Sequence, residues 1–246
     1  MQGAVDVSGQ GHGEGFVIAI DGPSGSGKSS TAKGVARARD LKYLDTGAMY
    51  RAMTWWMLTH GIDVSDPEAV AEAAPRPVIT MGIDPDAPTV HVDGVDVAQE
   101  IRTDIVTANV SAVSAVPRVR EILVARQREI IAEACATSPG IVVEGRDITT
   151  VVAPEAPVKL FLTASADARA QRRSREMQST DVMATREALV RRDQLDSTRA
   201  VAPLTQTPDA IELDTTGLTL DEVIALVVKL ADEAREAASR PSPQPR

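Results

Sequence analysis

The chain has 246 residues, of which 43% are hydrophobic and 25% charged, and its formal net charge is -9. This length is enough for one full hydrophobic core, and the composition excludes a disordered or fibrous protein. The negative net charge and the aromatic content of 2% argue against a protein that binds nucleic acid through a basic face or by stacking bases. The single cysteine, Cys135, excludes an internal disulfide, and we expect it to be a small core residue.

The two ends of the sequence differ in composition from the middle. Residues 1–15 are rich in glycine and residues 237–246 contain a run of proline and polar residues, so both are predicted to be disordered tails. Residues 16–236 are predicted to form a single domain. No stretch approaches 18 uncharged apolar residues, and the first residues do not have the pattern of a signal peptide. We therefore expect a cytoplasmic protein that does not contact a membrane.

Short apolar runs alternate with segments of helical periodicity along residues 16–236. This alternation is typical of a parallel β-sheet with helices on both faces, the α/β class. The segment 31–39 is compatible with a helix, and a final helix is predicted to begin at the capping box formed by Thr219 and Glu222. The predicted strands of the sheet are residues 16–20, 42–44, 141–144, 158–162 and 210–213.

One region interrupts this alternation. Residues 78–83, 89–92 and 95–97 are predicted to form three short strands, and the dipeptide Asp93-Gly94 between the last two favours a type I′ hairpin turn. A small antiparallel β insert is therefore expected within the α/β domain.

Residues 22–29 match the phosphate-loop pattern G-x-x-x-x-G-K-[ST] at every position, between a predicted strand and a predicted helix. In such a loop the backbone N–H groups bind phosphate oxygens, Lys28 reaches the β- and γ-phosphates, and Ser29 can ligate Mg²⁺. The structural alternative is a glycine-rich turn without a ligand. The residues expected to bind nucleotide phosphates are Gly22, Pro23, Ser24, Gly25, Ser26, Gly27, Lys28, Ser29 and Ser30.

Several classes of protein contain a phosphate loop. A GTPase needs an Asn-Lys-x-Asp segment to bind guanine, and the sequence has none. A nucleic-acid-dependent ATPase is usually longer and carries a basic face. A small-molecule kinase remains the favoured class.

Eight arginines fall within 31 positions, between residues 169 and 199. Guanidinium groups bind phosphate oxygens in pairs and keep their charge, and phosphoryl transfer between two anions requires excess positive charge. The alternative for this run is a solvated surface helix. The arginines are Arg169, Arg172, Arg173, Arg175, Arg186, Arg191, Arg192 and Arg199.

Two further polar segments follow predicted strands. Residues 45–51 follow the second strand and residues 144–147 follow the third, so both are expected at the carboxyl edge of the sheet, where ligands bind in open α/β folds. Each segment could instead be only a helix cap or a turn.

Seven segments appear in an order that resembles one known family. They are 20–29 (IDGPSGSGKS), 44–51 (LDTGAMYR), 100–103 (EIRT), 117–120 (PRVR), 144–147 (EGRD), 156–162 (APVKLFL) and 196–203 (DSTRAVAP). Together they resemble the bacterial cytidylate kinases, nucleoside-monophosphate kinases, over about residues 16–235. One departure is Glu144, where the family commonly has aspartate.

The resemblance implies a P-loop kinase with a five-stranded parallel sheet of order 2-3-1-4-5, a monophosphate-binding insert at about 46–116 and a helical lid at about 165–183. It implies ATP as phosphoryl donor, CMP or dCMP as acceptor and Mg²⁺ as cofactor. We expect the protein to be a monomer. The expected catalytic residues are Lys28 of the phosphate loop, Arg172 and Arg173 of the arginine run, and Arg146, which the resemblance places near the acceptor phosphate. The acceptor-binding residues it implies are Thr46, Tyr50, Arg51, Ser111, Arg120, Arg146, Asp147, Arg192, Asp196 and Arg199.

The expected reaction is therefore transfer of the γ-phosphoryl group of ATP to CMP. Alternatives are a kinase of another small acceptor, such as UMP or a shikimate-like hydroxyl compound, and a non-catalytic ATP-binding module. A hydroxyl acceptor would need a carboxylate to orient the attacking oxygen, whereas a phosphate acceptor needs additional cations.

Overall fold

The computed structural model describes residues 15–177 and 180–239. Residues 1–14 of the predicted leader and residues 240–246 of the predicted tail lie outside the described residues. Helix α8 (Leu220–Ser239) continues three residues into the predicted tail. Its first turn is held by the expected capping box, because the Thr219 hydroxyl accepts from Glu222 N–H while the Glu222 carboxylate accepts from Thr219 N–H.

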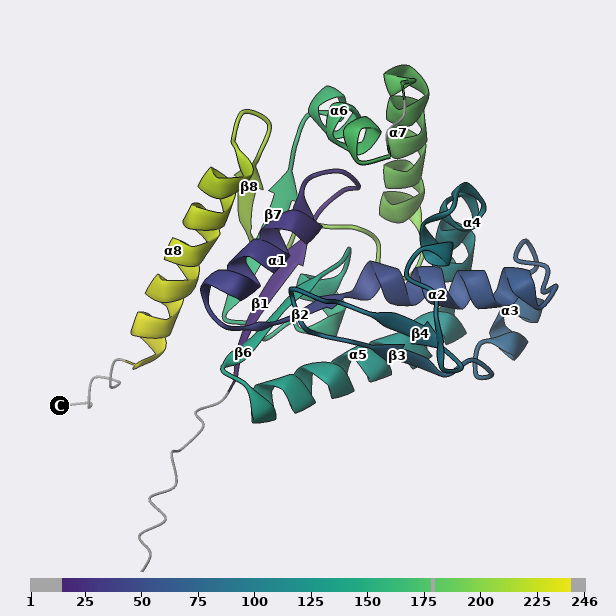
Figure 1. Cartoon of the computed structure of the whole chain (residues 1–246), viewed down its shortest axis with the longest axis horizontal. Coiled ribbons are helices and arrows are strands. Elements are labelled where there is room, and N and C mark those ends of the chain that lie inside the picture. The colour runs from purple at the N-terminus through teal and green to yellow at the C-terminus, as the bar shows by residue number, and fades with distance from the viewer. Residues whose placement is uncertain (1–14, 178–179, 240–246) are drawn as a thin grey trace, which may run out of the picture.

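Five parallel strands form the central sheet in the order β2-β6-β1-β7-β8 (Figure 1). Counted along the chain within this sheet, the order is 2-3-1-4-5, so the predicted topology is confirmed. Each strand begins and ends within one residue of its predicted range. The strands are β1 (Phe16–Asp21), β2 (Lys42–Asp45), β6 (Gly140–Glu144), β7 (Val158–Thr163) and β8 (Ile211–Asp214).

The two faces of the sheet are covered by different helices (Figure 1). Alternate residues of a strand point to opposite faces, so Ile18 and Ile20 of β1 pack with α1 (Lys28–Ala38) and α8, while Ala19 packs on the other side. That second face is covered mainly by α2 (Thr46–Thr59) and α5 (Pro117–Thr137). Burial on both faces explains why the strands are almost entirely apolar.

The predicted β insert forms a separate three-stranded antiparallel sheet between α2 and α5. Its strands are shorter than expected, and the turn before the last strand has φ of 52° at Asp93 and 81° at Gly94, as a type I′ turn requires. The remaining elements of this region are α3 (Pro67–Ala73), β3 (Ile79–Met81), β4 (Val90–Val92), β5 (Val95–Asp96), the 3₁₀ turn η1 (Glu100–Arg102) and α4 (Asp104–Ala115).

Two helices, α6 (Ala166–Met177) and α7 (Val182–Thr198), pack together beyond the carboxyl ends of the strands (Figure 1). The segment between them includes residues 178–179, which lie outside the described residues.

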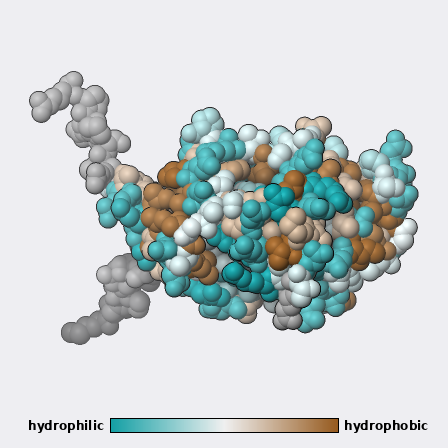
Figure 2. All heavy atoms as spheres, turned by 90° about the horizontal axis from the view of Figure 1, so that it is seen from above, coloured by the Kyte–Doolittle hydropathy of each residue, from teal (hydrophilic) through white to brown (hydrophobic). Residues whose placement is uncertain are grey.

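Exposed hydrophobic side chains on α7 include Met183, Val190 and Leu195. The face in Figure 2 mixes hydrophilic and hydrophobic residues. No helix in the described part of the chain has the length and apolarity needed to cross a bilayer.

A buried carboxylate joins β1 to the π-helical turn η2 (Ile148–Val152). Asp21, at the end of β1, accepts hydrogen bonds from Ile148 N–H (2.9 Å), Thr149 N–H (2.8 Å) and the Thr149 hydroxyl (2.7 Å). Asp21 is fully buried. These bonds fix the chain immediately after Asp147 at the carboxyl edge of the sheet.

Asp21→Ala should therefore destabilise the domain. Removing the acceptor leaves buried donors without partners, which should lower the free energy of unfolding by about 3 kcal/mol, measured by chemical denaturation. The matched control is Asp86→Ala, which removes an exposed ion pair with Arg37 and should change stability by less than about 0.5 kcal/mol. Equal effects of the two substitutions would contradict the structural role of Asp21.

Candidate active site

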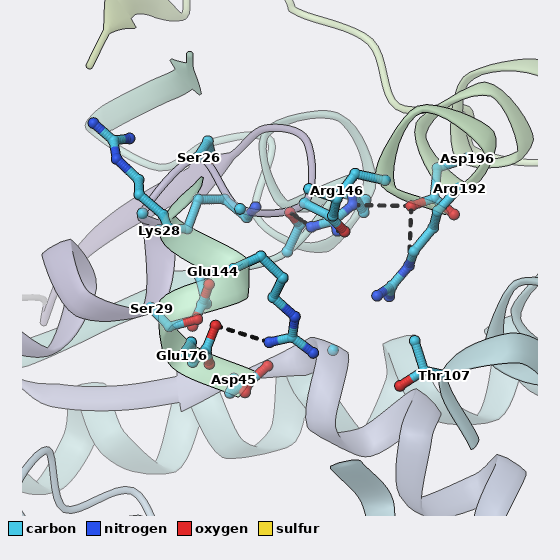
Figure 3. A pocket seen from close by; sticks show the side chains of 18 of the residues that line it. Ser26, Lys28, Ser29, Asp45, Thr107, Glu144, Arg146, Glu176, Arg192 and Asp196 are labelled. Atoms are coloured by element: carbon cyan, nitrogen blue, oxygen red, sulfur yellow. Dashed lines mark hydrogen bonds and ion pairs between the residues drawn. The ribbon is translucent and has the colours of Figure 1, made fainter. Parts of the chain in front are cut away.

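A cavity of about 660 Å³ opens at the carboxyl edge of the parallel sheet. Its walls come from the phosphate loop, the start of α2, the segment after β6, and helices α4, α6 and α7. The side chains in Figure 3 converge on it from elements far apart in the sequence. The cavity therefore lies where parallel α/β sheets bind ligands.

The phosphate loop occupies the connection between β1 and α1, as the pattern predicts. Gly22 has φ of 146°, and a Cβ atom there would lie 2.1 Å from the Leu162 carbonyl oxygen, so only glycine fits. Gly27 is in the left-handed conformation (φ 90°) and precedes the first residue of α1, Lys28. The helix therefore begins three residues before the predicted segment, with its N-terminus directed at the cavity.

Lys28 is buried in this loop, and its Nζ donates to the Pro23 carbonyl oxygen at 2.8 Å. Burial, followed by the positive charge of Arg146, lowers the pKa of Lys28 to about 7. An anion in the cavity would favour the protonated form. A polyphosphate bound in the cavity would therefore stabilise the charged ammonium group of Lys28.

A group of oxygen ligands lies beside Lys28. Burial and the nearby Asp45 raise the pKa of Glu144, while hydrogen bonds from Tyr43 and Ser29 lower it. The Tyr43 hydroxyl donates to Glu144 Oε1 at 2.5 Å. Glu144, Asp45 and Ser29 all line the cavity (Figure 3). Two carboxylates and a hydroxyl form the type of donor set that a hard divalent cation prefers, and a cation would relieve the repulsion between the carboxylates.

Several arginines on the other side of the cavity repel one another. Burial, then the charges of Arg192 and Arg173, lower the pKa of Arg51 to about 9. Burial, then the charge of Arg146, lower the pKa of Arg192 to about 10. Among the described residues the buried Nε of Arg192 has no hydrogen-bond partner. This concentration of positive charge is suited to a multiply charged anion.

The arginines of α6 have different roles. Arg172 donates to the Thr215 hydroxyl (2.8 Å) and carbonyl oxygen (2.5 Å), Arg173 donates to Glu176 (2.8 Å), and both arginines line the cavity. Arg169 is buried against the phosphate loop instead, and Arg175 is exposed and does not line this cavity. The solvated-helix interpretation therefore fits Arg175.

The far end of the cavity contains paired charges. Asp147 lines it and accepts from Arg120, whose guanidinium also donates to the Ser114 carbonyl oxygen (3.1 Å) and lies 5.3 Å from the centre of the Tyr50 ring. Arg199 approaches the other Asp147 oxygen at 4.0 Å. This end presents a carboxylate held in a fixed orientation by a cation behind it.

A second paired carboxylate, Asp196, lies on α7. It accepts from Arg146 Nε at 3.0 Å and from the Ser111 hydroxyl at 3.4 Å, and Arg192 is 4.0 Å away (Figure 3). Thr46 lies nearby in the lining and donates to the Glu144 carbonyl oxygen at 2.7 Å. The polar segments 45–51 and 144–147 therefore meet at the carboxyl edge of the sheet, as predicted.

Most of the predicted site residues line one cavity. The four that do not are Gly22, Pro23, Ser111 and Arg120; they lie directly behind lining residues, except that Gly22 packs on β7. The sequence interpretation did not single out the lining residues Arg102, Thr107, Glu176 and Thr215 for a role. Among these four residues, only Arg102 belongs to a segment that carries the family resemblance, the segment EIRT.

Comparison with known proteins gives a consistent result. Residues 18–233 match the family model described as Cytidylate kinase. A protein named Cytidylate kinase from Streptomyces griseus is 59% identical over 222 residues, 90% of this chain and 95% of its own length. One of the same name from Streptomyces coelicolor is 60% identical over 219 residues, 89% of this chain and 94% of its own. A third, from Nocardia farcinica, is 52% identical, covering 85% of this chain and 90% of its own length.

The buried pair at the far end of the cavity allows a direct test of its geometry. Arg120→Met should lower the free energy of unfolding by about 3 kcal/mol or more, because it leaves the Asp147 carboxylate buried without its cation. The double variant Arg120→Met/Asp147→Leu should recover part of this loss. The control, Arg118→Met on the same helix, breaks an exposed pair with Glu121 and should cost less than about 0.5 kcal/mol in chemical denaturation. An Arg120→Met variant as stable as Arg118→Met would show that the buried pair is not formed.

Proposed function

The chain belongs to the cytidylate kinase family and transfers a phosphoryl group from ATP to CMP or dCMP, and we propose that the cavity at the carboxyl edge of the sheet is its active site. The observation that carries this proposal is the meeting of a phosphate loop with a second group of cations, Arg51, Arg146 and Arg192, in one cavity. A kinase whose donor and acceptor are both phosphates needs both sets of charges.

ATP is proposed to bind at the phosphate loop. The backbone N–H groups of residues 25–29 and the N-terminus of α1 would bind the β- and γ-phosphates. Lys28 would exchange its contact with Pro23 for the phosphate oxygens. Arg172 and Arg173 both line the cavity and would contact the transferred group.

The donor set of Ser29, Glu144 and Asp45 fits Mg²⁺ bound together with ATP. When bound, Mg²⁺ neutralises charge on the phosphates. The sequence predicts only Ser29 as a ligand of Mg²⁺. The structure suggests the two carboxylates as well, because Glu144 is buried beside Ser29 and is repelled by Asp45. The rest of the coordination would come from the nucleotide and water.

CMP is proposed to bind in the remaining half of the cavity. Its phosphate would contact Arg51, Arg146, Arg192 and Arg199, and its sugar Thr46, Asp196 and Arg192. Its base would meet Asp147, with Arg120, Ser111 and Tyr50 around it. The region of about 46–116 would form the wall on the acceptor side, since α2 and α4 contribute Arg51, Thr107 and Val110 to the lining.

The reaction proposed is in-line transfer. An oxygen of the CMP phosphate forms a bond to the γ-phosphorus as the bond to the β,γ-bridging oxygen breaks, giving CDP and ADP. The acceptor phosphate is already ionised near neutral pH, so no general base is required, and catalysis comes from alignment and charge neutralisation. Lys28, Arg146, Arg172 and Arg173 would supply the positive charge around the transferred group.

Helices α6 and α7 are proposed to act as a lid, which includes the expected segment of about 165–183. They carry Arg173, Arg192 and Asp196 to the cavity from outside the sheet. Closure over both nucleotides would exclude water, which would otherwise accept the phosphoryl group. We also propose that the protein works as a monomer in the cytoplasm.

The alternative of a hydroxyl acceptor is disfavoured by the charges of the site. The two buried carboxylates of the acceptor half, Asp147 and Asp196, are each paired with arginine, so neither is a free base for a hydroxyl. The charges of Arg51 and Arg192 lie in the same half of the cavity, which suits a phosphate acceptor and not a neutral hydroxyl. An ATP-binding module without catalysis would not need that second group of cations.

The proposed function is tested by ADP formation with CMP, dCMP, UMP, AMP, GMP and shikimate as acceptors. Turnover should be fastest with CMP and dCMP. Lys28→Met, which removes the charge and keeps the length, should lower kcat by about 10²-fold or more in a folded protein. Preference for another acceptor, or near-normal turnover of Lys28→Met, would contradict the proposal.

Asp147 should determine the choice between cytosine and uracil. Cytosine carries an amino donor at the position where uracil carries a carbonyl acceptor. In Asp147→Asn the amide oxygen can keep the bond from Arg120, which turns the amide N–H₂ toward the cavity and replaces an acceptor with a donor. The CMP:UMP ratio of kcat/KM should fall by about ten- to two-hundred-fold. Proportional loss of both activities would assign Asp147 a purely structural role.

A further inference from the structure

Ser24, in the phosphate loop, is held by three segments at once. Its N–H donates to Asp193 Oδ1 (3.1 Å), its carbonyl oxygen accepts from Arg169 Nη1 (3.1 Å), and its hydroxyl accepts from Arg146 Nη2 (2.6 Å). Ser24 itself is buried. The orientation of this part of the loop therefore depends on side chains from α6, α7 and the segment after β6.

Asp193 and Arg169 form one unit behind the loop. Arg169 donates to the second Asp193 oxygen and, through Nε, to the Ala164 carbonyl oxygen at 3.1 Å. The pair is nearly buried, with side chains 10% and 16% exposed. Because Arg169 neutralises Asp193, the carboxylate can hold a loop N–H without placing net negative charge next to the polyphosphate.

Helix α7 carries Asp193 between two residues of the acceptor half. Arg192 and Asp196 line the cavity, whereas Asp193 is directed to the phosphate loop. Asp196 also accepts from Arg146, and Arg146 donates to the Ser24 hydroxyl. Two routes therefore join α7 to Ser24, one direct and one through the guanidinium proposed to bind the acceptor phosphate.

We propose that Asp193 is a positioning residue that ties the phosphate loop to α7 and thereby couples binding at the donor site to binding at the acceptor site. This inference rests on the proposed function of the cavity. CMP contacts Arg192, Asp196 and Arg146, and so orders α7. Through Asp193 the loop is ordered in the same step, and a nucleotide that binds second meets a loop already in place. By reciprocity the donor tightens CMP binding by the same factor.

The test measures binding of ADP by calorimetry with and without CMP, a pair that cannot react. In the wild type CMP should lower the Kd of ADP about five-fold or more, the lower end of typical coupling between sites. Asp193→Asn keeps the size of the side chain but cannot both accept from Ser24 N–H and pair with Arg169, so the ratio should fall below about two-fold. The charge-matched control Glu187→Gln, at an exposed position of α7, should keep the wild-type ratio.

A second readout does not involve the donor nucleotide. CMP alone should slow hydrogen exchange of the loop amides of residues 22 and 24–27 in the wild type and in Glu187→Gln, but not in Asp193→Asn. Arg169→Lys, which keeps the charge and loses the planar fork, provides a second variant and should also lose coupling.

The outcomes separate the two proposals. A wild type that makes no CDP would overturn the proposed function. A wild type that makes CDP but shows no effect of CMP on ADP binding, or an Asp193→Asn variant with wild-type coupling and loop protection, would overturn the role of Asp193 alone.

Discussion

Repulsion among buried cations is the constraint on which the site depends. The chain is acidic overall, with a formal net charge of -9, yet Lys28 and Arg51 are buried and Arg192 is half-buried around one cavity. Each has a pKa lowered first by desolvation and then by a neighbouring arginine. Such an arrangement costs free energy unless an anion lies among the cations. It persists because a rigid sheet edge and several helices hold the side chains, and the phosphates of two nucleotides would relieve the repulsion. Because an anion relieves this repulsion, the site binds anions in preference to neutral ligands.

The fold could be predicted from the sequence because its signals are local. Strands buried on both faces are continuous apolar runs, and the phosphate loop, the Asp93-Gly94 turn and the Thr219–Glu222 capping box are patterns of a few adjacent residues. The position of the phosphate loop at the carboxyl edge, and of the segments that follow the other strands, then follows from the parallel order of the strands. Arg146 and Asp147 could be placed in the site on that basis, together with the family resemblance.

The partners of the site residues could not be predicted in the same way, since they depend on contacts between distant segments. Arg169 belongs to the same run as Arg172 and looks equivalent in sequence, but its position on α6 directs it to Ser24 and not to the cavity. Thr215, after β8, accepts from Arg172 and donates to the Ser26 carbonyl oxygen, a contact across 189 positions. Helical spacing shows which residues share a face, and only the packing of α6 against the loop shows what that face meets.

The charged residues of the site fall into two kinds: paired residues that orient the phosphate loop and other parts of the cavity, and cations that attract phosphate. Pairs such as Arg120–Asp147 and Arg169–Asp193 are neutral overall, so they contribute little attraction for phosphate. Their fixed geometry orients the phosphate loop and the end of the cavity where we propose that the base binds. Arg192 Nε makes no hydrogen bond within the described chain and lies 4.0 Å from Asp196 Oδ2, so Arg192 is held less tightly and supplies attraction for phosphate. Arg146 joins the two kinds, because it is paired with Asp196 and also bound to Ser24. A ligand that draws Arg146 toward its own phosphate would therefore act on the phosphate loop, where we propose that the other nucleotide binds.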